Sequence, residues 1–376
     1  MQADMKITRV RVHHLAAPMR RRFGWSLNWT SLRTATLVEV NTDCGLTGWG
    51  DGGFGGERLR RHPELVIGRS PFEVEAIYDD LRPPAEAQHD RGEPAGAGLD
   101  VALWDLVGKA LDMPVSKLLG RRYHSRITPY CTCMYRQDWP DLAEGLAEEA
   151  RSWVAKGFRI LKMKIGYGPE LDVAVVRAVR RAVGADIGLA IDANCAYDDG
   201  TALALGRRLE EFNLLWWEEP VWADDLAGYD RLRRLLRMPL AGGETFSADA
   251  VARCYVAPSR VEIAQPDLDT VGLTGGRRIA QLCALNGVRL VPHNWGTHVR
   301  TAGELHWMAG FPEVAGWGPM FEFDQTENPL RESVVRQRIE LDPADGRIPV
   351  PTGPGLGIDV VREAVDQFRT ELITIC

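Results

Sequence analysis

The sequence predicts an α/β protein in which parallel strands and helices alternate around a barrel, preceded by a smaller α+β layer. Two observations carry this prediction. The chain has 376 residues, which is more than one average domain needs. Polar residues also follow short apolar runs at steps of 28, 26, 26, 23, 26 and 29 residues; they are Lys164, Asp192, Glu218, Glu244, Asp267, His293 and Glu322.

A step of this size is what one strand, one helix and two loops consume, and eight such units make a barrel of ~250 residues. Side chains at the C-terminal ends of the strands converge on one mouth of such a barrel, where barrel enzymes keep their chemistry. The repeat therefore predicts the fold and the place of a candidate active site together.

The α+β layer comes first in the chain. Alternation and β-branched residues predict strands at 5–15 and 34–42, and a turn joins the second strand to a short partner at 46–50. Apolar residues at helical spacing predict helices at 71–83 and 97–120. We expect this α+β domain to occupy residues 1–125.

Eight strand-like runs predict the barrel, which we expect to occupy residues 126–340. The runs are 127–134, 158–166, 187–194, 214–220, 238–244, 261–267, 288–294 and 316–323. Helical segments lie between them, for example 172–184 and 201–212. The tail, 341–376, is rich in glycine and proline and then helical over 360–369, and we expect it to pack back on the first domain.

Composition describes an ordinary globular protein, with 45% hydrophobic and 26% charged residues. The net charge of −7 gives no reason to expect nucleic acid, which prefers a clustered basic face. The seven cysteines form no zinc-binding spacing, and neither a signal peptide nor an apolar run of membrane-spanning length is evident. We therefore expect a cytoplasmic protein without a membrane partner.

The carboxylates Asp192, Glu218 and Glu244 end three consecutive predicted strands, so a right-handed βα array places them side by side. Three carboxylates in one barrel mouth repel one another unless a cation lies among them, and such an oxygen site suits Mg²⁺. Each carboxylate alone could instead cap a helix or form a salt bridge. Because side chains alternate along a strand, Glu218 is predicted to bind the ion and Glu219 to support it from behind.

Lys162 and Lys164 lie two residues apart and share one face of a predicted strand. Two ammonium groups this close, beside a metal, are expected to lower each other's pKa and to free one lysine as a base. The alternative is that both side chains reach solvent at the rim. Asn194 shares a face with Asp192 and is expected to touch a substrate hydroxyl.

Asp267 and His293 end the sixth and seventh predicted strands. A carboxylate that accepts from one imidazole nitrogen fixes the tautomer and leaves the other nitrogen to exchange protons. Because the second and seventh strands lie across the barrel, Lys164 and His293 are expected on opposite sides of a bound substrate. With Glu322 near the last strand, such a site is built to remove a proton from the carbon beside a carboxylate, whose enediolate needs the charge of the metal and a lysine.

These residues resemble the enolase superfamily, in its mandelate racemase-like subgroup, which uses a Lys or His base with Mg²⁺. The motifs that carry the resemblance are DVALWDLVGKALDMPVSKLLG, KMK, IDAN, WWEEP, GGE, QPD and VPHNWGT. The resemblance implies a modified (β/α)7β barrel beneath an α+β capping domain. It also implies metal ligands at Asp192, Glu218 and Glu244, a base at Lys164 assisted by Lys162, a dyad of His293 with Asp267, and an eighth-strand acid at Glu322.

Within that subgroup, the motifs VPHNWGT, FEFDQTENPLRE and IPVPTGPGLGID look most like acid-sugar enzymes, such as the galactarolactone cycloisomerases and related dehydratases. The resemblance implies that capping-domain loops choose the substrate, here 17–30 and 50–56, and it suggests dimers or octamers. Expected substrate contacts are Arg20 and its neighbours Arg21 and Arg22, with Trp25 and Trp295. An arginine would hold the distal carboxylate of a diacid; a solvated basic loop is the alternative.

Three functions remain open from the sequence. The first is a Mg²⁺-dependent lyase or cycloisomerase acting on an acid sugar or its lactone, by α-proton abstraction and β-elimination. The second is a racemase or epimerase of a 2-hydroxy acid that uses the same two bases. The third is a non-catalytic barrel, against which the complete set of ligands and bases argues. The expected partner is a small carboxylate, which the sequence does not name.

Overall fold

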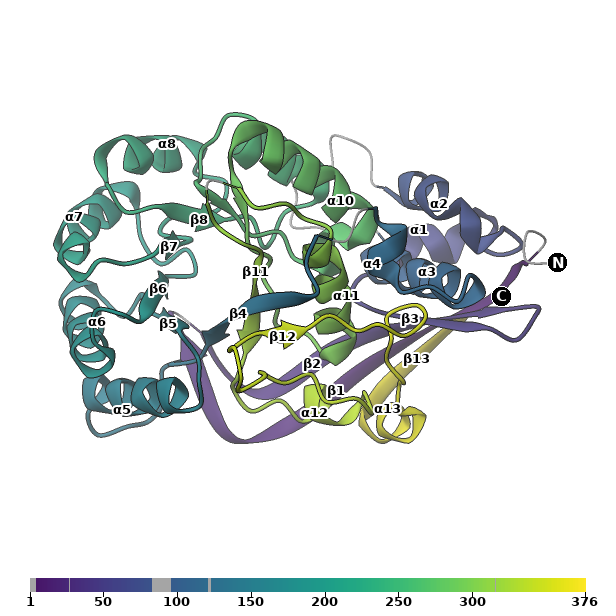
Figure 1. The fold of residues 1–376 in the computed structure, drawn as a ribbon, viewed down its shortest axis with the longest axis horizontal. Helices are drawn as coiled ribbons and strands as arrows, with labels where there is room; N and C mark the ends of the chain where they lie inside the picture. Colours follow the sequence, from purple (N-terminus) through teal and green to yellow (C-terminus); the bar gives the residue numbers. More distant parts are fainter. Residues whose placement is uncertain (1–4, 27, 83–95, 121–122, 315) are drawn as a thin grey trace.

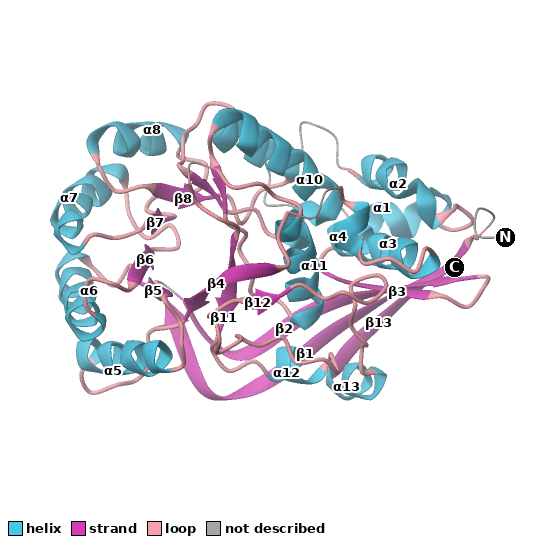
Figure 2. Ribbon diagram, in the orientation of Figure 1, coloured by secondary structure: helices cyan, strands magenta, loops and turns pink. Residues whose placement is uncertain are grey.

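The computed structural model describes residues 5–26, 28–82, 96–120, 123–314 and 316–376. An antiparallel sheet with its helices forms one part of the molecule, and a ring of parallel strands surrounded by helices forms the other (Figures 1 and 2). The first and last strands lie side by side in the antiparallel sheet, where Val10 pairs with Ile375 (Figure 1). A parallel barrel with a separate antiparallel sheet is the architecture that the sequence predicts.

The antiparallel sheet has the strand order β13-β1-β2-β3. Its strands are β1 (Ile7–Trp25), β2 (Asn28–Thr42), β3 (Thr47–Asp51) and β13 (Arg369–Ile375). The first predicted strand ends too early, because β1 and β2 pair as far as Trp25 opposite Asn28. Segment 17–30 is therefore mostly the outer end of a long hairpin rather than a loop; residue 27 lies outside the described residues.

The helices of this domain are α1 (Gly56–Arg61), α2 (Val74–Leu81), α3 (Ala97–Ala110) and α4 (Val115–Leu118), with 3₁₀ turns η1 (Pro63–Leu65) and η2 (Pro71–Glu73). The single helix predicted for 97–120 is wrong, because α3 and α4 are separate. Asp112 has a φ of 53°, and Pro114 precedes α4 with an extended backbone, so the helical bonding cannot continue. Residue 83 of the other predicted helix lies outside the described residues.

Eight parallel strands form the barrel, one in each predicted run. They are β4 (Arg126–Thr132), β5 (Ile160–Lys164), β6 (Gly188–Asp192), β7 (Trp217–Glu218), β8 (Leu240–Gly242), β9 (Ile263–Ala264), β10 (Arg289–Leu290) and β11 (Met320–Asp324). The ladder runs from β10 through β4 to β11. Between β10 and β11 the Glu322 amide donates to the Pro292 carbonyl at 3.2 Å, which brings the two ends of the sheet together.

Helices follow the strands on the outside of the ring. They are α5 (Leu142–Ala155), α6 (Pro169–Val183), α7 (Asp199–Leu209) with η4 (Glu210–Phe212), α8 (Leu226–Leu235), α9 (Ala248–Ala250) with the π-helical η5 (Val251–Val256), α10 (Leu268–Asn286), α11 (His298–Ala309) and α12 (Pro329–Ser333). Side-chain oxygens cap many of their first turns; Asp141, Asp198 and Asp225 do so for α5, α7 and α8. No helix among the described residues is long and apolar enough to cross a bilayer.

The barrel interior is filled with apolar side chains beneath a polar mouth. Large and small residues alternate around it, with the fully buried Trp216 beside Ala190 and Ala241 in one cluster. Tyr130 packs edge-on against Trp216 with ring centroids 5.2 Å apart. The packed interior leaves the ends of the strands as the place where ionisable groups meet.

The tail returns to the first domain, but not only as the predicted helix. After β12 (Ile348–Pro349), which pairs with β4, the chain forms α13 (Arg362–Phe368) and then β13, which pairs with β1. The prediction misses β13, because an edge strand needs neither a long apolar run nor strict alternation: Leu372 within it is 44% exposed. The residue boundaries 1–125, 126–340 and 341–376 stay predictions.

Close packing of β3 on α3 depends on glycine. A Cβ on Gly50 would lie 1.9 Å from the Gly98 carbonyl oxygen, a backbone atom that cannot rotate away. We expect Gly50→Ala to lower the free energy of unfolding by about 1–3 kcal/mol, measured by denaturant titration. Gly318→Ala is the matched control, since its Cβ would meet only the Glu313 side chain at 3.6 Å. Equal losses in the two variants would contradict this account of the contact.

Candidate active site

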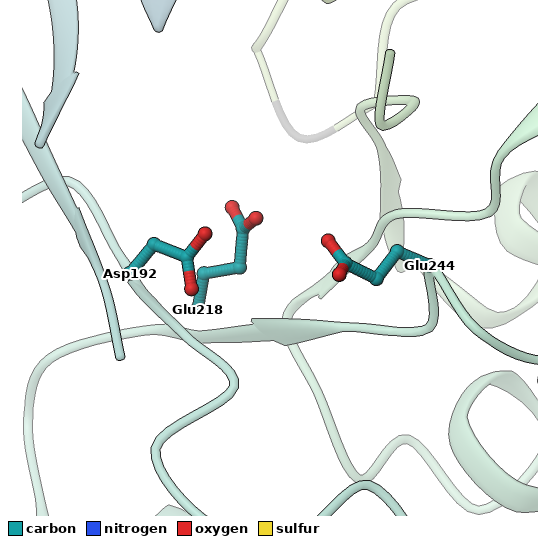
Figure 3. A group of neighbouring side chains, drawn as sticks. All are labelled: Asp192, Glu218 and Glu244. Carbon is teal, nitrogen blue, oxygen red and sulfur yellow. The ribbon is translucent and has the colours of Figure 1, made fainter. Parts of the chain in front are cut away.

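The carboxylates of Asp192, Glu218 and Glu244 face one another at the C-terminal ends of their strands (Figure 3). One ligand atom of each residue lies within 4.8 Å of those of the other two. Asp192 and Glu218 are register partners on β6 and β7, and Glu244 follows β8. In the described part of the chain, no other three acidic, His or Cys side chains converge this closely.

These three residues fit a hard divalent cation. All the ligand atoms are carboxylate oxygens, which Mg²⁺ prefers. Burial and the neighbouring Asp192 raise the pKa of Glu218 to about 8, because crowded carboxylates resist ionisation until positive charge joins them. Oε2 of Glu244 is buried and accepts no hydrogen bond, although Nε2 of His293 lies 3.3 Å away. This oxygen is therefore available to an ion.

Lys162 and Lys164 are both buried and point at the carboxylates rather than at solvent. Nζ of Lys162 lies 2.5 Å from Glu218 Oε1 and 3.0 Å from Glu322 Oε1, and Nζ of Lys164 donates to Asp192 Oδ2. Burial lowers the pKa of Lys162, but Glu218 and Glu322 raise it well above its usual value. The pKa of Lys164 is likewise raised, since Asp192 outweighs its burial.

The protein's own charges raise the pKa of both lysines overall, so the lowering expected beside a metal stays a prediction. The repulsion from Lys162 does act to lower the pKa of Lys164, but the facing carboxylates act more strongly. In turn the two lysines outweigh burial at Asp192 and lower the pKa of that carboxyl to about 2.

His293 and Asp267 form a close pair on the opposite side of the mouth. Nδ1 of His293 lies 2.5 Å from Asp267 Oδ2, and Nε2 lies 3.3 Å from Glu244 and 3.7 Å from Glu322. Burial raises the pKa of Asp267, but Arg300 and His293 lower it below its usual value, so Asp267 is an ionised acceptor and Nδ1 is the donor. Nε2 is left to face the centre of the site.

Glu322 lies between the two sides. Its Oε1 is 3.0 Å from Lys162 Nζ and accepts from the Thr132 hydroxyl, while its Oε2 accepts from the Asn294 amide at 3.0 Å. Burial raises the pKa of Glu322, yet Lys162 and His293 lower it overall. An ionised Glu322 thus holds the lysine pair and the imidazole in one network.

Asn194 and Glu219 follow the ligand strands in an unusual backbone conformation. Their φ values are 44° and 40°, in the left-handed region that side chains rarely adopt. Oδ1 of Asn194 is buried without a hydrogen-bond partner. Glu219 accepts from the Cys195 thiol at 3.3 Å. Burial and Glu244 raise the pKa of Glu219 well above its usual value.

A cavity of about 590 Å³ opens beside the His293 side of the mouth. Asp267, His293 and Trp295 line it from the barrel, and residues 52–54 line it from the first domain. His14, Thr34 and Thr36 add polar groups from the middle of β1 and β2. Segment 50–56 was expected at the site, whereas these three residues were not.

The hairpin end formed by β1 and β2 covers the mouth. Gly24 and Arg136 exchange two backbone hydrogen bonds of 2.7 and 2.8 Å, which fasten the hairpin to the loop after β4. Trp25 packs edge-on against Trp295 with ring centroids 5.6 Å apart. The two predicted tryptophans are thus in contact, and Trp295 is the one that lines the cavity.

The predicted arginines do not reach the cavity. Arg20 is 89% exposed and pairs with Glu327 at 3.0 Å, Arg22 pairs with Asp138 at 2.8 Å, and Arg21 is exposed. The buried arginine of this hairpin is Arg33, which donates to Asp324 at 2.8 Å and lies 4.4 Å from the Trp295 ring centroid. Arg20 therefore lies outside the site that the structure assembles.

Comparison with known proteins identifies the family. Residues 145–364 match the family described as Enolase C-terminal domain-like, and residues 7–120 match the Mandelate racemase / muconate lactonizing enzyme, N-terminal domain. The chain belongs to the mandelate racemase / muconate lactonizing enzyme family. As a member of this enolase-superfamily group it is an enzyme, either a lyase or an isomerase.

Similar members of the family are known from several organisms. The D-galactarolactone cycloisomerase of Agrobacterium fabrum is 37% identical over 97% of this chain and 99% of its own length. The arabinonate dehydratase of Saccharolobus solfataricus is 33% identical over 73% of this chain and 71% of its own. The crystal structure of the 3,6-anhydro-D-galactonate cycloisomerase from Zobellia galactanivorans superposes with a TM-score of 0.84 at 32% identity, covering 97% of this chain and 100% of that one.

Sequence reasoning missed several residues that this member of the family brings to the site. Arg300 and Asp269 line the cavity beside the dyad, and His14 lines its opposite wall. No local pattern distinguishes them: His14 sits in an alternating strand, and Arg300 is one arginine among many. Three-dimensional proximity alone brings them to the site.

Proposed function

We propose that this enzyme removes the proton α to the carboxylate of an acid sugar or its lactone and then eliminates a β-leaving group, as a dehydratase or a lactone cycloisomerase. One observation carries the proposal. Two proton-transfer groups flank a single carboxylate cluster, with Lys164 in contact with Asp192 and Nε2 of His293 3.3 Å from Glu244. A substrate carboxylate held at the cluster would therefore present its α-carbon between them.

In this proposal Lys164 is the base on one side, and Lys162 assists it with positive charge. His293 transfers a proton through Nε2 on the other side, while Asp267 holds Nδ1. Glu322 connects the two sides through its contacts with Lys162 and with the Asn294 amide after His293. Removal of the α-proton on one side and donation to the leaving group on the other together complete an elimination.

Asp192, Glu218 and Glu244 would hold Mg²⁺, with Glu219 behind them. When bound there, the ion supplies positive charge that makes the α-proton of the substrate carboxylate more acidic. The protein's own contribution is to fix the three oxygens on neighbouring strands and to keep them largely out of water. The assignment is supported by the chemistry of the oxygen donors and by Oε2 of Glu244, which is buried and accepts no hydrogen bond.

The cavity supports a polyhydroxy acid as the substrate. Its volume of about 590 Å³ lies within the ~300–1,000 Å³ range of small-molecule sites. Hydroxyl and imidazole groups of Thr34, Thr36 and His14 can exchange hydrogen bonds with sugar hydroxyls, and Trp295 offers an apolar face. Asn194 stays a proposed hydroxyl contact, and Trp25, which packs against Trp295, stays a proposed substrate contact. The relatives named for sugar-acid and lactone substrates favour the same class.

Racemisation or epimerisation is the second candidate, because the same two bases on opposite sides would also invert an α-carbon. The family includes the racemase after which it is named. A substrate with a β-leaving group loses it in the first reaction and keeps it in the second, so product analysis separates the two. The homo-oligomeric state stays a prediction.

The proposal is tested by a panel of acid sugars and their lactones, incubated in D₂O with Mg²⁺ and followed by NMR. We expect at least one to exchange its α-proton for deuterium, and productive members of the panel to lose a β-substituent as well. Exchange reports proton abstraction even where turnover is slow. If no member of a broad panel exchanges, the proposal is wrong; exchange with no elimination would favour the racemase.

A further inference from the structure

A chain of hydrogen bonds connects a buried carboxylate of the first domain to the His293–Asp267 dyad of the barrel. Asp51 is the last residue of β3 and has no exposed surface. Its Oδ2 accepts from the amide and the hydroxyl of Thr297, both at 2.7 Å, and its Oδ1 accepts from Arg300 at 3.0 Å. Thr297 caps α11, so Asp51 sits at the start of a barrel helix although it belongs to the other sheet.

Arg300 continues this connection to the dyad. Its Nη1 donates to both oxygens of Asp267, at 3.0 and 3.1 Å, and lies 3.2 Å from Asp269. Asp267 also accepts from the Asp269 amide at 2.8 Å and faces His293 at 2.5 Å. Arg300, the Asp269 amide and His293 thus fix the Asp267 carboxylate. Because the carboxylate is fixed, the His293 ring can bond to it in one orientation.

The side chain of Lys164 is held by residues of the barrel instead. It bonds to Asp192 of the neighbouring strand and lies 5.4 Å from the Tyr135 ring centroid, both within the barrel. The first domain is therefore connected to His293 through a chain of charged hydrogen bonds, whereas Lys164 bonds to a strand of the barrel.

We propose that Asp51 and Arg300 are positioning residues for His293, so that docking of the first domain orients the dyad selectively. The inference rests on the proposed function only for its kinetic readout. Charged hydrogen bonds along Asp51, Arg300 and Asp267 hold the carboxylate, and the carboxylate holds the ring. Loosening any member lets the imidazole turn, which impairs proton transfer at Nε2 and spares Lys164.

The test compares Asp51→Asn and Arg300→Lys with the matched control Asp105→Asn. Asp105 is likewise a buried carboxylate of the first domain; it accepts from the Trp49 and Leu356 amides at 2.9 and 2.8 Å, away from the dyad. Exchange of the α-proton is measured with two substrates that are epimers at the α-carbon, one presenting its proton to each side. Thermal unfolding of every variant is recorded beside it.

We expect Asp51→Asn and Arg300→Lys to reduce exchange on the His293 side by about 100-fold and to leave the Lys164 side within a few-fold. Asp105→Asn should leave the ratio of the two rates unchanged. The inference would be overturned if the folded Asp51→Asn and Arg300→Lys variants kept the wild-type ratio of the two exchange rates, whether both rates fell equally or neither fell. A variant that fails to fold is replaced in the test by the other one.

A second readout needs no substrate. The Nδ1 proton of His293 lies in a short hydrogen bond to Asp267 and should give a far-downfield proton NMR signal, identified by its loss in His293→Asn. We expect Asp51→Asn and Arg300→Lys to shift or broaden this signal and Asp105→Asn to preserve it. If the wild-type enzyme exchanges the α-proton of no acid sugar, the proposed function fails. The NMR signal still tests the positioning role in that case.

Discussion

Replacing Lys164 with alanine is expected to reduce turnover by about 10²–10⁴-fold, the contribution usual for a general base. Its ammonium group lies at the end of β5, buried against Asp192 of the neighbouring strand. The measurement is the steady-state rate on whichever acid sugar the exchange panel identifies. The Michaelis constant should change much less than the rate.

Lys164→Arg tests whether Lys164 acts as a base or only contributes positive charge. Arginine keeps the positive charge beside Asp192 but does not release a proton in proteins, so this variant should be nearly as inactive as Lys164→Ala. An arginine variant that retained most of the rate would mean that Lys164 serves electrostatics only. Unfolding curves that overlay the wild type would exclude loss of structure as the cause.

Removal of the divalent ion is expected to reduce turnover by at least about 10³-fold, since charge stabilisation by a bound metal is worth several kcal/mol. Exhaustive EDTA treatment followed by gel filtration should abolish both turnover and α-proton exchange, and added Mg²⁺ should restore them. Activity that survives this treatment would rule out the carboxylate group as a catalytic metal site.

Glu218→Gln tests the same site without a chelator. The amide keeps the shape of the side chain, which lies 2.5 Å from Lys162, but supplies no anionic oxygen to the ion, so we expect a similar loss that saturating Mg²⁺ only partly restores. Glu39→Gln is the matched control, because Glu39 is as deeply buried but lies in the antiparallel sheet with His13 and Arg362. The control should respond to chelation and to added Mg²⁺ as the wild type does.

The barrel and its polar mouth could be predicted because their determinants are local and periodic. Each strand is a short apolar run, and the register pairs Lys164 with Asp192 and Asp192 with Glu218 at the strand ends. The side chains at successive strand ends must then lie together. Nothing beyond the spacing of the runs is needed to bring the three carboxylates within reach of one ion.

The covering hairpin and β13 could not be predicted in the same way. The arginines of segment 17–30 break the period of two, and the strand is recognised only by its pairing with β2 and with Arg136. Non-local backbone pairing of this kind leaves no pattern in either partner's sequence. The same reason hid Arg33, whose burial depends on Asp324 almost three hundred residues away.

Electrostatic detail was also beyond local reasoning. The two lysines were expected to lower each other's pKa beside a metal, an expectation that leaves the surrounding carboxylates out. The structure surrounds them with Asp192, Glu218 and Glu322, and these carboxylates reverse the direction. Predicting a pKa needs every charge within several ångströms, and a sequence supplies only those on the same strand.

The most direct test of two proton-transfer groups on opposite sides is a crossed exchange experiment. Lys164→Ala, His293→Asn and the double variant are each incubated in D₂O with two acid-sugar epimers that differ at the α-carbon. We predict that Lys164→Ala stops α-proton exchange in one epimer and His293→Asn stops it in the other. The double variant should exchange the α-proton of neither epimer. Loss of the same epimer in both single variants, or exchange by the double variant, would contradict the account.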